Sequence, residues 1–314
     1  MHHPKPIDSS VTPRFAGVAT FMRLPQYESA EGLDIAIFGV PFDLGSSFSG
    51  GQRFAPAKIR EHSRLIRQVN SYSKIAPFDL CRVADVGDTP INPVDLMDSI
   101  GRIETFVQRI HDAGAWPLAA GGDHMITLPI LRRIAARKPV GIVQFDAHPD
   151  TLDELLGTKY NHATPIRRAV EEGLIDPKRS LQIGLRGTCY SPDDFRYGID
   201  VGMRVITMDE YEELGRANVI EEIKRVCSDG PTYITFDIDG LDPVFAPGVG
   251  TPEPGGLTMR DAQVILRSMR GLNIIGADLV EMSPPFDVGG TTAISAANMM
   301  FEMLCLMAEN RTSH

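Results

Sequence analysis

Six side chains that could bind divalent metal ions lie in three short segments of this sequence. They are His124, Asp146, His148, Asp150, Asp237 and Asp239. In the second and third segments these residues are two positions apart, and alternate side chains of an extended chain point to the same side. Two imidazoles and four carboxylates exceed the ligand number of a tetrahedral zinc ion. The set instead suits two divalent cations that share bridging carboxylates, with Mn²⁺ as the natural candidate.

Each of these aspartates, taken singly, could be a helix cap or a turn residue instead. Four carboxylates packed together without cations would raise one another's pKa through repulsion. The set as a whole therefore favours a metal centre over a group of turn residues.

Two further side chains could act beside such a centre. His162 stands directly before a predicted helix, where it could relay protons or simply cap the helix. Glu281 ends an apolar run, and its carboxylate could pair with a planar guanidinium through two hydrogen bonds. A salt bridge on the surface or between helices is the alternative role for Glu281.

Short apolar runs recur along the chain, and most are followed by a segment with helical periodicity. The predicted strands are residues 34–42, 81–86, 116–120, 140–145, 181–185, 204–208, 233–236 and 274–280. The predicted helices are residues 56–69, 94–113, 127–137, 165–173, 217–228, 258–269 and 293–309. This alternation predicts an α/β protein with three α/β/α layers and a mostly parallel sheet of about eight strands. A closed eight-stranded barrel is the second choice, because the spacing between strands is uneven.

This fold would bring the candidate ligands together. Ligands of open parallel sheets bind beyond the carboxyl ends of the strands, and the three metal-binding segments follow such ends. We interpret residues 1–33 as an irregular N-terminal arm, docked on its own core or on a neighbouring subunit. Residues 34–314 form a single predicted domain, because no repeat, low-complexity tract or linker divides them.

The composition argues against several classes of partner. The net charge is −10 and no basic run occurs, which disfavours binding to nucleic acid or to an anionic membrane. We expect no apolar run long enough to cross a bilayer and no signal peptide. The four cysteines lie far apart, as expected of reduced thiols, and this predicts a cytoplasmic protein.

The same segments resemble those of the ureohydrolase family, which comprises arginases, agmatinases and guanidino-acid hydrolases. The matching segments are residues 121–124, 146–150, 235–243, 246–253 and 281–285. They stand in the family's order and extend almost from end to end. Residues 14–17 and 20–25 look most like the agmatinase and guanidino-acid hydrolase branch, which includes guanidinopropionases and guanidinobutyrases.

The resemblance implies an arginase-like fold, a binuclear centre and a homo-oligomer of three or six subunits. Mn²⁺ is the usual metal of the family, and Ni²⁺ serves some members that cleave guanidine or biguanides. By motif, one metal would be held by His124, Asp146, Asp150 and Asp237, and the other by Asp146, His148, Asp237 and Asp239. The family pattern also assigns His162 to proton transfer and Glu281 to the substrate guanidinium.

The implied reaction is hydrolysis of a guanidino C–N bond by a metal-bridging hydroxide, which releases an amine and urea or a urea analogue. Two cations lower the pKa of a shared water and so supply hydroxide near neutral pH. Asp150 could take the proton of the nucleophile and pass it to the leaving nitrogen. Candidate substrates are guanidinobutyrate, guanidinopropionate, agmatine, guanidine and a substituted biguanide.

The sequence departs from the family pattern at several positions. Ala163 follows His162 where the family usually has glycine, and Pro149 replaces serine, threonine or alanine. The loop that usually reads Gly-Ala-Arg-x-Gly-Pro is Gly-Gln-Arg-Phe-Ala-Pro at residues 51–56. Leu152 replaces an asparagine that in arginases helps to hold the amino-acid head group, so arginine is a poor substrate candidate.

We expect substrate choice to depend on residues 151–161, because this loop connects Asp150 with His162. Its leucines offer apolar surface, and Lys159, Arg53, Arg186 or a neighbouring subunit could pair with a carboxylate tail. We predict a small neutral, cationic or alkylated tail over an α-amino acid head group.

Two functions of other kinds stay open on sequence grounds. The chain could be a catalytically weak structural subunit of a hetero-oligomer of related chains. It could also be another two-metal amidohydrolase, such as a deacetylase-like enzyme.

Overall fold

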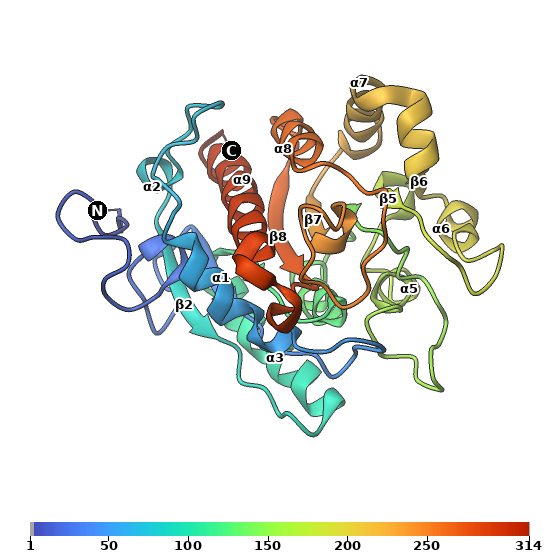
Figure 1. Cartoon of the computed structure of the whole chain (residues 1–314), viewed down its shortest axis with the longest axis horizontal. Helices are drawn as coiled ribbons and strands as arrows, with labels where there is room; N and C mark the ends of the chain where they lie inside the picture. The colour runs from blue at the N-terminus through green and yellow to red at the C-terminus, as the bar shows by residue number, and fades with distance from the viewer. Residues whose placement is uncertain (1–2, 314) are drawn as a thin grey trace.

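The computed structural model describes residues 3–313, and its centre is a sheet of eight strands. The strands are β1 (Ile35–Gly39), β2 (Val83–Asp88), β3 (Trp116–Ala120), β4 (Gly141–Phe145), β5 (Leu181–Leu185), β6 (Arg204–Thr207), β7 (Thr232–Asp237) and β8 (Ile274–Val280). Their order is β2-β1-β3-β8-β7-β4-β5-β6, and every neighbouring pair is parallel. The sheet is open, with β2 and β6 at its edges (Figure 1). The predicted three-layer architecture is therefore confirmed, and the alternative of a closed barrel is wrong.

Helices cover both faces of this sheet. They are α1 (Ala55–Ser63), α2 (Pro77–Leu80), α3 (Leu96–Asp112), α4 (Thr127–Ile134), α5 (Pro165–Glu171), α6 (Arg196–Val201), α7 (Met208–Cys227), α8 (Met259–Ser268) and α9 (Thr291–Ser313). Helices α2, α9, α8 and α7 follow one another along one side of the molecule (Figure 1), and α1 packs on α9 in the same layer. Helices α3, α4 and α5 form the opposite layer around a second apolar core.

The strand sequences reflect this double cover. Every residue of β1, β4, β5 and β7 is buried, which accounts for apolar runs that are continuous rather than alternating. Each predicted strand and helix overlaps an observed one. Helices α2 and α6 are missing from the prediction because four and six residues are too few to show a helical period.

Helix α7 begins nine residues before its predicted start, at Met208 instead of residue 217. The side chain of Thr207 caps it by accepting a hydrogen bond from the backbone N–H of Glu210. Gly215 has a φ of 72° and bends the helix. The glycine interrupts the periodicity, so only the half that follows it can be read from the sequence.

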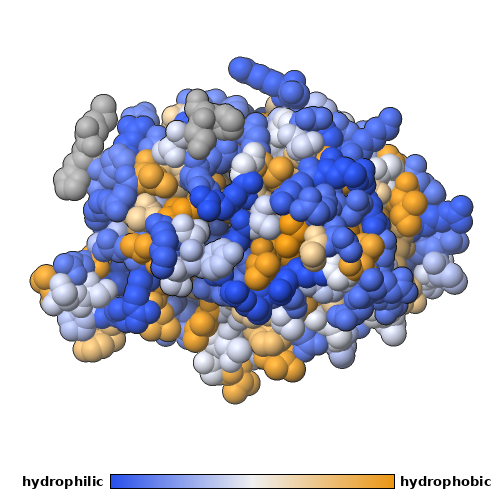
Figure 2. Space-filling model, turned by 90° about the horizontal axis from the view of Figure 1, so that it is seen from above, coloured by the Kyte–Doolittle hydropathy of each residue, from blue (hydrophilic) through white to orange (hydrophobic). Residues whose placement is uncertain are grey.

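Helix α9 contradicts the expectation that no apolar run is long enough to cross a membrane. The stretch Val288–Thr312 is long enough to cross a membrane, and an 18-residue window within it has a mean hydropathy of 1.3. However, 83% of this window is buried inside the molecule. Helices α1, α2 and α8 and strand β8 surround α9, and a helix covered in this way is apolar on all sides. On the face shown in Figure 2, hydrophilic side chains predominate and hydrophobic ones form small patches.

Residues 3–33, the described part of the predicted arm, pack on the core of their own chain near β2. Phe21 and Met22 are buried, and the backbone N–H of Met22 donates to the Ser63 hydroxyl of α1 at 2.8 Å. The backbone N–H of Tyr27 donates to the carbonyl oxygen of Asp85 in β2, also at 2.8 Å. This segment therefore covers one edge of the sheet, whereas its status as a separate arm stays a prediction.

Arg60 on α1 joins this segment to β2. Its guanidinium donates to both carboxylate oxygens of Asp85, at 2.8 and 3.0 Å, and to Asp88 at 2.6 Å. The guanidinium carbon also lies 4.2 Å from the ring centre of Phe21. Asp85 is fully buried, so the compensation of its charge depends on Arg60.

We expect Arg60→Ala to lower the free energy of unfolding by about 3–5 kcal/mol, because it leaves the Asp85 carboxylate buried without its cation. Urea unfolding of purified protein measures the change. Arg102→Ala is the matched control, since the Arg102–Asp98 pair is exposed on α3, and it should change the free energy by no more than about 1 kcal/mol. Equal effects of the two substitutions would contradict the structural role of Arg60.

Candidate metal centre and active site

The candidate ligands lie where four central strands of the sheet end. His124 follows β3, Asp146 follows β4, Asp237 is the last residue of β7 and Glu281 follows β8. These strands are neighbours in the order β3-β8-β7-β4, and their carboxyl ends lie at one edge. This is the edge at which open parallel sheets bind their ligands.

Gly121 and Gly122 allow the chain after β3 to approach its neighbours. A Cβ atom at Gly121 would lie 2.5 Å from a carbonyl oxygen of β8, and one at Gly122 would lie 2.4 Å from a carbonyl oxygen of the loop after β1. Only glycine fits at such distances. The close approach brings His124 beside β8, where its backbone N–H donates to Oε1 of Glu281 at 2.7 Å.

One group of ligand atoms surrounds His124. Its Nδ1 lies 3.1 Å from Oδ2 of Asp146, 2.8 Å from Oδ2 of Asp150 and 3.3 Å from Oδ2 of Asp237. All four side chains are buried. The Nδ1 atom has no hydrogen-bond partner although it is buried, as expected of a nitrogen that awaits a metal ion.

A second group lies next to the first. Nδ1 of His148 is 3.1 Å from Oδ2 of Asp239 and 3.6 Å from Oδ1 of Asp146. Asp146 therefore contributes one oxygen to each group. Two His and Asp groups joined by a shared carboxylate fit a binuclear divalent centre. The structure thus brings all six predicted ligands together, and their assignment to individual ions stays a prediction.

Without bound cations, the buried carboxylates of this centre repel one another strongly. Burial, together with the neighbouring carboxylates of Asp239 and Asp146, raises the pKa of Asp237 well above its usual value. Burial and the Asp146 charge raise the pKa of Asp150 to about 6. Divalent cations would become the largest local charges and would keep these carboxyl groups ionised. The donor set therefore fits the metal centre of the family.

Two of the acidic residues have unusual backbone conformations. Asp150 has a φ of 53° and Glu281 a φ of 65°, in the left-handed region that non-glycine residues rarely adopt. The carbonyl oxygen of Asp150 accepts hydrogen bonds from the first turn of α5, at the backbone N–H groups of Ile166 and Arg167. Such conformations persist where the surroundings hold them, and they gather at functional sites.

A buried chain of hydrogen bonds orients His124 from behind. Its Nε2 lies 2.8 Å from the hydroxyl of Thr235, which donates to Oδ1 of Asp278 at 2.7 Å. Oδ2 of Asp278 accepts from the hydroxyls of Thr127 and Tyr233, both at 2.8 Å. Because Thr235 gives its proton to Asp278, it accepts from Nε2–H, and this tautomer leaves the lone pair of Nδ1 free for a metal.

Two buried glutamines support the turn after β4. Nε2 of Gln144 donates to Oδ2 of Asp146 at 2.7 Å. Nε2 of Gln182 donates to Oε1 of Gln144 at 2.6 Å and to the carbonyl oxygen of Pro149 at 2.7 Å. The shared carboxylate of Asp146 is thus held by a neutral hydrogen-bond donor, which Gln182 in turn supports.

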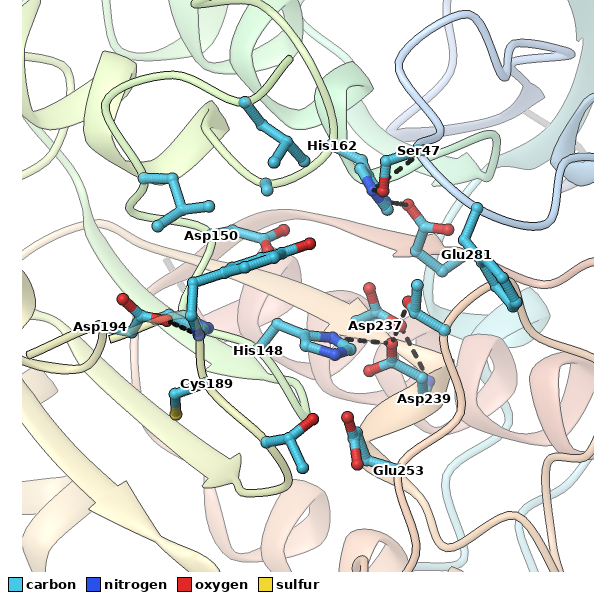
Figure 3. Close-up of a pocket in the computed structure, with 18 of the residues that line it drawn as sticks. Ser47, His148, Asp150, His162, Cys189, Asp194, Asp237, Asp239, Glu253 and Glu281 are labelled. Carbon is cyan, nitrogen blue, oxygen red and sulfur yellow. Dashed lines mark hydrogen bonds and ion pairs between the residues drawn. The ribbon is translucent and has the colours of Figure 1, made fainter. Parts of the chain in front are cut away.

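His162 and Glu281 lie together beside the ligand groups (Figure 3). Nδ1 of His162 is 3.2 Å from Oε1 of Glu281, and its Nε2 is 2.7 Å from the hydroxyl of Ser47. Burial disfavours the charged imidazole, but the carboxylates of Glu281, Asp150 and Asp123 outweigh burial and raise the pKa of His162 to about 9. The imidazole therefore holds a proton next to the candidate metal centre.

Asp123 stabilises the loop that carries Ser47. Its Oδ2 accepts from the backbone N–H of Gly45 at 2.7 Å, and the carbonyl oxygen of Gly45 accepts from the backbone N–H of His162 at 3.1 Å. Burial and the nearby Glu281 charge raise the pKa of Asp123 to about 8. The loop after β1 and the loop after β4 are thereby held together over the site.

A pocket of about 460 Å³ opens above these residues. His148, Asp150, Asp237, Asp239, His162 and Glu281 all line it. Leu152 and Leu155 form part of its wall as predicted, whereas Leu156 is 84% exposed and does not. Phe48 and Tyr190, which are 81% and 84% exposed, stand at its rim.

The cations considered for a carboxylate tail are engaged elsewhere. Arg186 lines the pocket, but its guanidinium donates to backbone carbonyl oxygens, among them those of Asp239, Leu241 and Glu253. Arg53 pairs with Asp43 and Lys159 with Asp153, and neither Arg53 nor Lys159 lines the pocket. The wall also carries the carboxylates of Asp194 and Glu253.

Several residues of this site are absent from the sequence-based prediction. They are Ser47, Gln52, Asp123, Gln144, Gln182, Thr235 and Asp278. Asp123 and Thr235 stand inside the family-like segments, so their position there was the available signal. Gln52 stands in the loop of residues 51–56, which departs from the family pattern, and Gln144 is two positions before Asp146, so both also had a signal in the sequence. The roles of Ser47, Gln182 and Asp278 become visible only when the strand order is known.

The chain belongs to the arginase family, whose model matches residues 33–305. It is 53% identical over 309 residues to guanidinopropionase of Pseudomonas aeruginosa, covering 98% of this chain and 97% of that protein. It is 46% identical to guanidinobutyrase of the same organism, with 96% of each chain covered. The structure of proclavaminate amidino hydrolase from Streptomyces clavuligerus superposes with a TM-score of 0.92 at 39% identity, covering 95% of this chain and all of that one.

These findings confirm the predicted family and the predicted enzyme class. The chain is a ureohydrolase that hydrolyses guanidino C–N bonds, as the named hydrolases among its relatives do. The arginase family uses a binuclear divalent metal site, and the His and Asp cluster fits one. The alternatives of a catalytically weak subunit and of a deacetylase-like enzyme are thereby disfavoured.

We expect Thr235→Val to weaken metal binding by about 10–100-fold, because His124 loses the acceptor that fixes its tautomer. Titration of the metal-free protein with Mn²⁺ measures the dissociation constant. Thr232→Val is a matched control on the same strand, since the Thr232 hydroxyl is buried without a hydrogen-bond partner. If both variants bind Mn²⁺ like the wild type, the hydrogen-bond chain does not orient the ligand.

Proposed function

We propose that this enzyme hydrolyses a guanidino compound with a small neutral, cationic or alkylated tail at a binuclear metal centre. The observation that carries this proposal is the pair of His and Asp groups that share Asp146 at the floor of a pocket also lined by Glu281 and His162. When bound, the two divalent cations supply a water of lowered pKa as the nucleophile. The products would be an amine and urea, or a urea analogue.

The side chains around this floor have complementary tasks. The Glu281 carboxylate would bind the substrate guanidinium, since a guanidinium prefers a carboxylate partner. Asp150 lines the pocket beside His124 and could take up the proton of the attacking water. His162 holds its proton on the side of the pocket and could donate it toward the leaving amine. Buried surroundings strengthen each of these interactions.

The tail preference rests on the charges in the pocket wall. Asp194 and Glu253 face the pocket, whereas the guanidinium of Arg186 is taken up by backbone carbonyl groups. A carboxylate tail would thus need a cation from a neighbouring subunit of a homo-oligomer. Leu152 and Leu155 offer apolar contact to a short alkyl chain.

Mn²⁺ is the metal that we propose, with Ni²⁺ as the second candidate. Four carboxylates favour a hard divalent cation, whereas two imidazoles also suit nickel. Metal analysis of purified protein should give two ions per chain. Reconstitution of the metal-free protein with each metal, followed by an activity assay, identifies the metal that supports turnover.

A panel assay tests the proposed substrate class. Release of urea and amine would be measured for agmatine, guanidine, guanidinobutyrate, guanidinopropionate, a substituted biguanide and arginine, with either metal bound. We expect arginine to have the lowest kcat/KM, because Leu152 cannot hydrogen-bond an amino-acid head group. Preferential hydrolysis of arginine would refute the proposed tail preference. Failure to release an amine, or ammonia in the case of guanidine, from every one of these compounds would refute the proposed function.

We expect His162→Ala to retain both metals and to lower kcat by about 10²–10⁴-fold, as is usual for the loss of an acid–base group. His162 lies outside both ligand groups, which is why the metal content should persist. His111→Ala, an exposed substitution at the end of α3, is the control and should leave kcat unchanged. A normal kcat for His162→Ala would leave His162 with a structural role alone.

A further inference from the structure

Gln52 contacts the carboxylate that faces the substrate. It is fully buried. Its Nε2 donates to Oε2 of Glu281 at 2.9 Å and to the carbonyl oxygen of Ser49 at 3.1 Å, while its Oε1 accepts from the hydroxyl of Ser46 at 3.1 Å. Since Nε2 faces two acceptors, the orientation of the amide is unambiguous.

This contact changes the hydrogen-bonding capacity of Glu281. An ionised carboxylate offers about four acceptor positions, two on each oxygen. Oε1 already faces the backbone N–H of His124 at 2.7 Å and Nδ1 of His162 at 3.2 Å. Oε2 accepts from Gln52, so one acceptor position remains. With alanine at position 52, Oε2 would keep two positions for a substrate.

The pocket determines which part of the substrate meets Glu281. Glu281 is 1% exposed and lies at the floor, whereas Phe48 and Tyr190 mark the open rim. A tail on one guanidino nitrogen must point toward the rim, where there is room. The edge formed by the two terminal nitrogens then faces Glu281. This step rests on the proposed function, in which Glu281 binds the guanidinium.

We propose that Gln52 is a specificity-determining residue that acts through Glu281. Because Gln52 occupies one acceptor position of Oε2, a substrate whose terminal edge carries two N–H donors binds no better than a substrate whose edge carries one. The enzyme would therefore accept guanidino compounds whose terminal nitrogen carries alkyl groups as readily as unsubstituted ones. Gln52 is a positioning residue, because it contacts the carboxylate and does not line the pocket itself.

The reaction is the same hydrolysis for both kinds of substrate. The oxygen of water forms a bond to the guanidino carbon, and the bond between this carbon and the tail nitrogen breaks. Both protons of water end on the leaving amine, which departs as an ammonium ion, because the other nitrogens of the guanidinium already carry the hydrogens that they have in the urea product. The second product is urea for the unsubstituted substrate and N,N-dimethylurea for the substrate with a dimethylated terminal nitrogen. No oxidant or reductant is needed.

The experiment compares two substrates that differ only at that nitrogen: 4-guanidinobutylamine and its analogue with one terminal nitrogen dimethylated. The measured quantity is kcat/KM for release of the tail amine, which is common to both. In the wild type we expect the two values to agree within about threefold. In Gln52→Ala and in Gln52→Met the ratio should shift by on the order of tenfold or more toward the unsubstituted substrate, because Glu281 gains a free acceptor position.

The two variants separate the hydrogen bond from packing. Methionine keeps the volume of glutamine but cannot donate, so a shift in Gln52→Ala alone would mean that a cavity, not the hydrogen bond, matters, and would overturn the proposal. Gln108→Met removes a glutamine that donates to Asp112 on α3, away from the pocket, and should leave the ratio unchanged.

The wild type provides a test that does not depend on the folding of any variant. A wild type that hydrolyses the unsubstituted substrate but disfavours the dimethylated one by more than about tenfold, a difference the size of one charge-assisted hydrogen bond, contradicts the role of Gln52. An unchanged ratio in both variants does the same. If the wild type with Mn²⁺ or Ni²⁺ bound releases amine from neither substrate but hydrolyses another member of the panel, the role of Gln52 fails and the proposed function stands. Failure with the whole panel refutes both.

Discussion

The repulsion among buried carboxylates is the constraint on which the site depends. Four aspartates and a glutamate lie within one buried region at the carboxyl ends of the central strands. Burial makes their charges expensive, and their proximity adds to the cost, so the pKa of Asp237 rises well above its usual value. Divalent cations are the natural compensation, and the unpartnered Nδ1 of His124 lies among the oxygens that would bind them. The fold therefore maintains a geometry that becomes favourable only when metal binds.

Maintaining this geometry requires rigid neighbours on every side. The strands that carry the ligands are fully buried, and glycines after β3 allow the chains to come within contact distance. Asp150 and Glu281 adopt left-handed backbone conformations that their surroundings must stabilise. The stability of the two helical layers thus supports a centre that by itself opposes folding.

The sequence predicts the fold and the candidate ligands because both depend on local patterns. Continuous apolar runs identify the strands, and the candidate ligands follow the ends of these runs. The expected alternation along an extended chain is wrong, because β4 ends before Asp146, Asp150 has a φ of 53° and Asp239 lies in a short 3-10 helix. Family-like segments add His162 and Glu281. Gln52 and Asp278 are different: Gln52 lies 229 positions from Glu281, and Asp278 is 43 positions from Thr235. The first contact depends on the segment after β1 lying beside the end of β8, and the second on the pairing of β7 with β8, so neither follows from the local sequence.

The chemistry of the supporting side chains has a physical reason. A lysine or arginine beside Asp146 or Glu281 would be a cation competing with the metals and with the substrate guanidinium for the same carboxylates. Gln144 and Gln52 donate hydrogen bonds to these carboxylates without adding charge. The guanidinium of Arg186 is near, but it is turned to backbone carbonyl groups. Neutral donors can therefore position the carboxylates while leaving their negative charge available to the cations that perform the reaction.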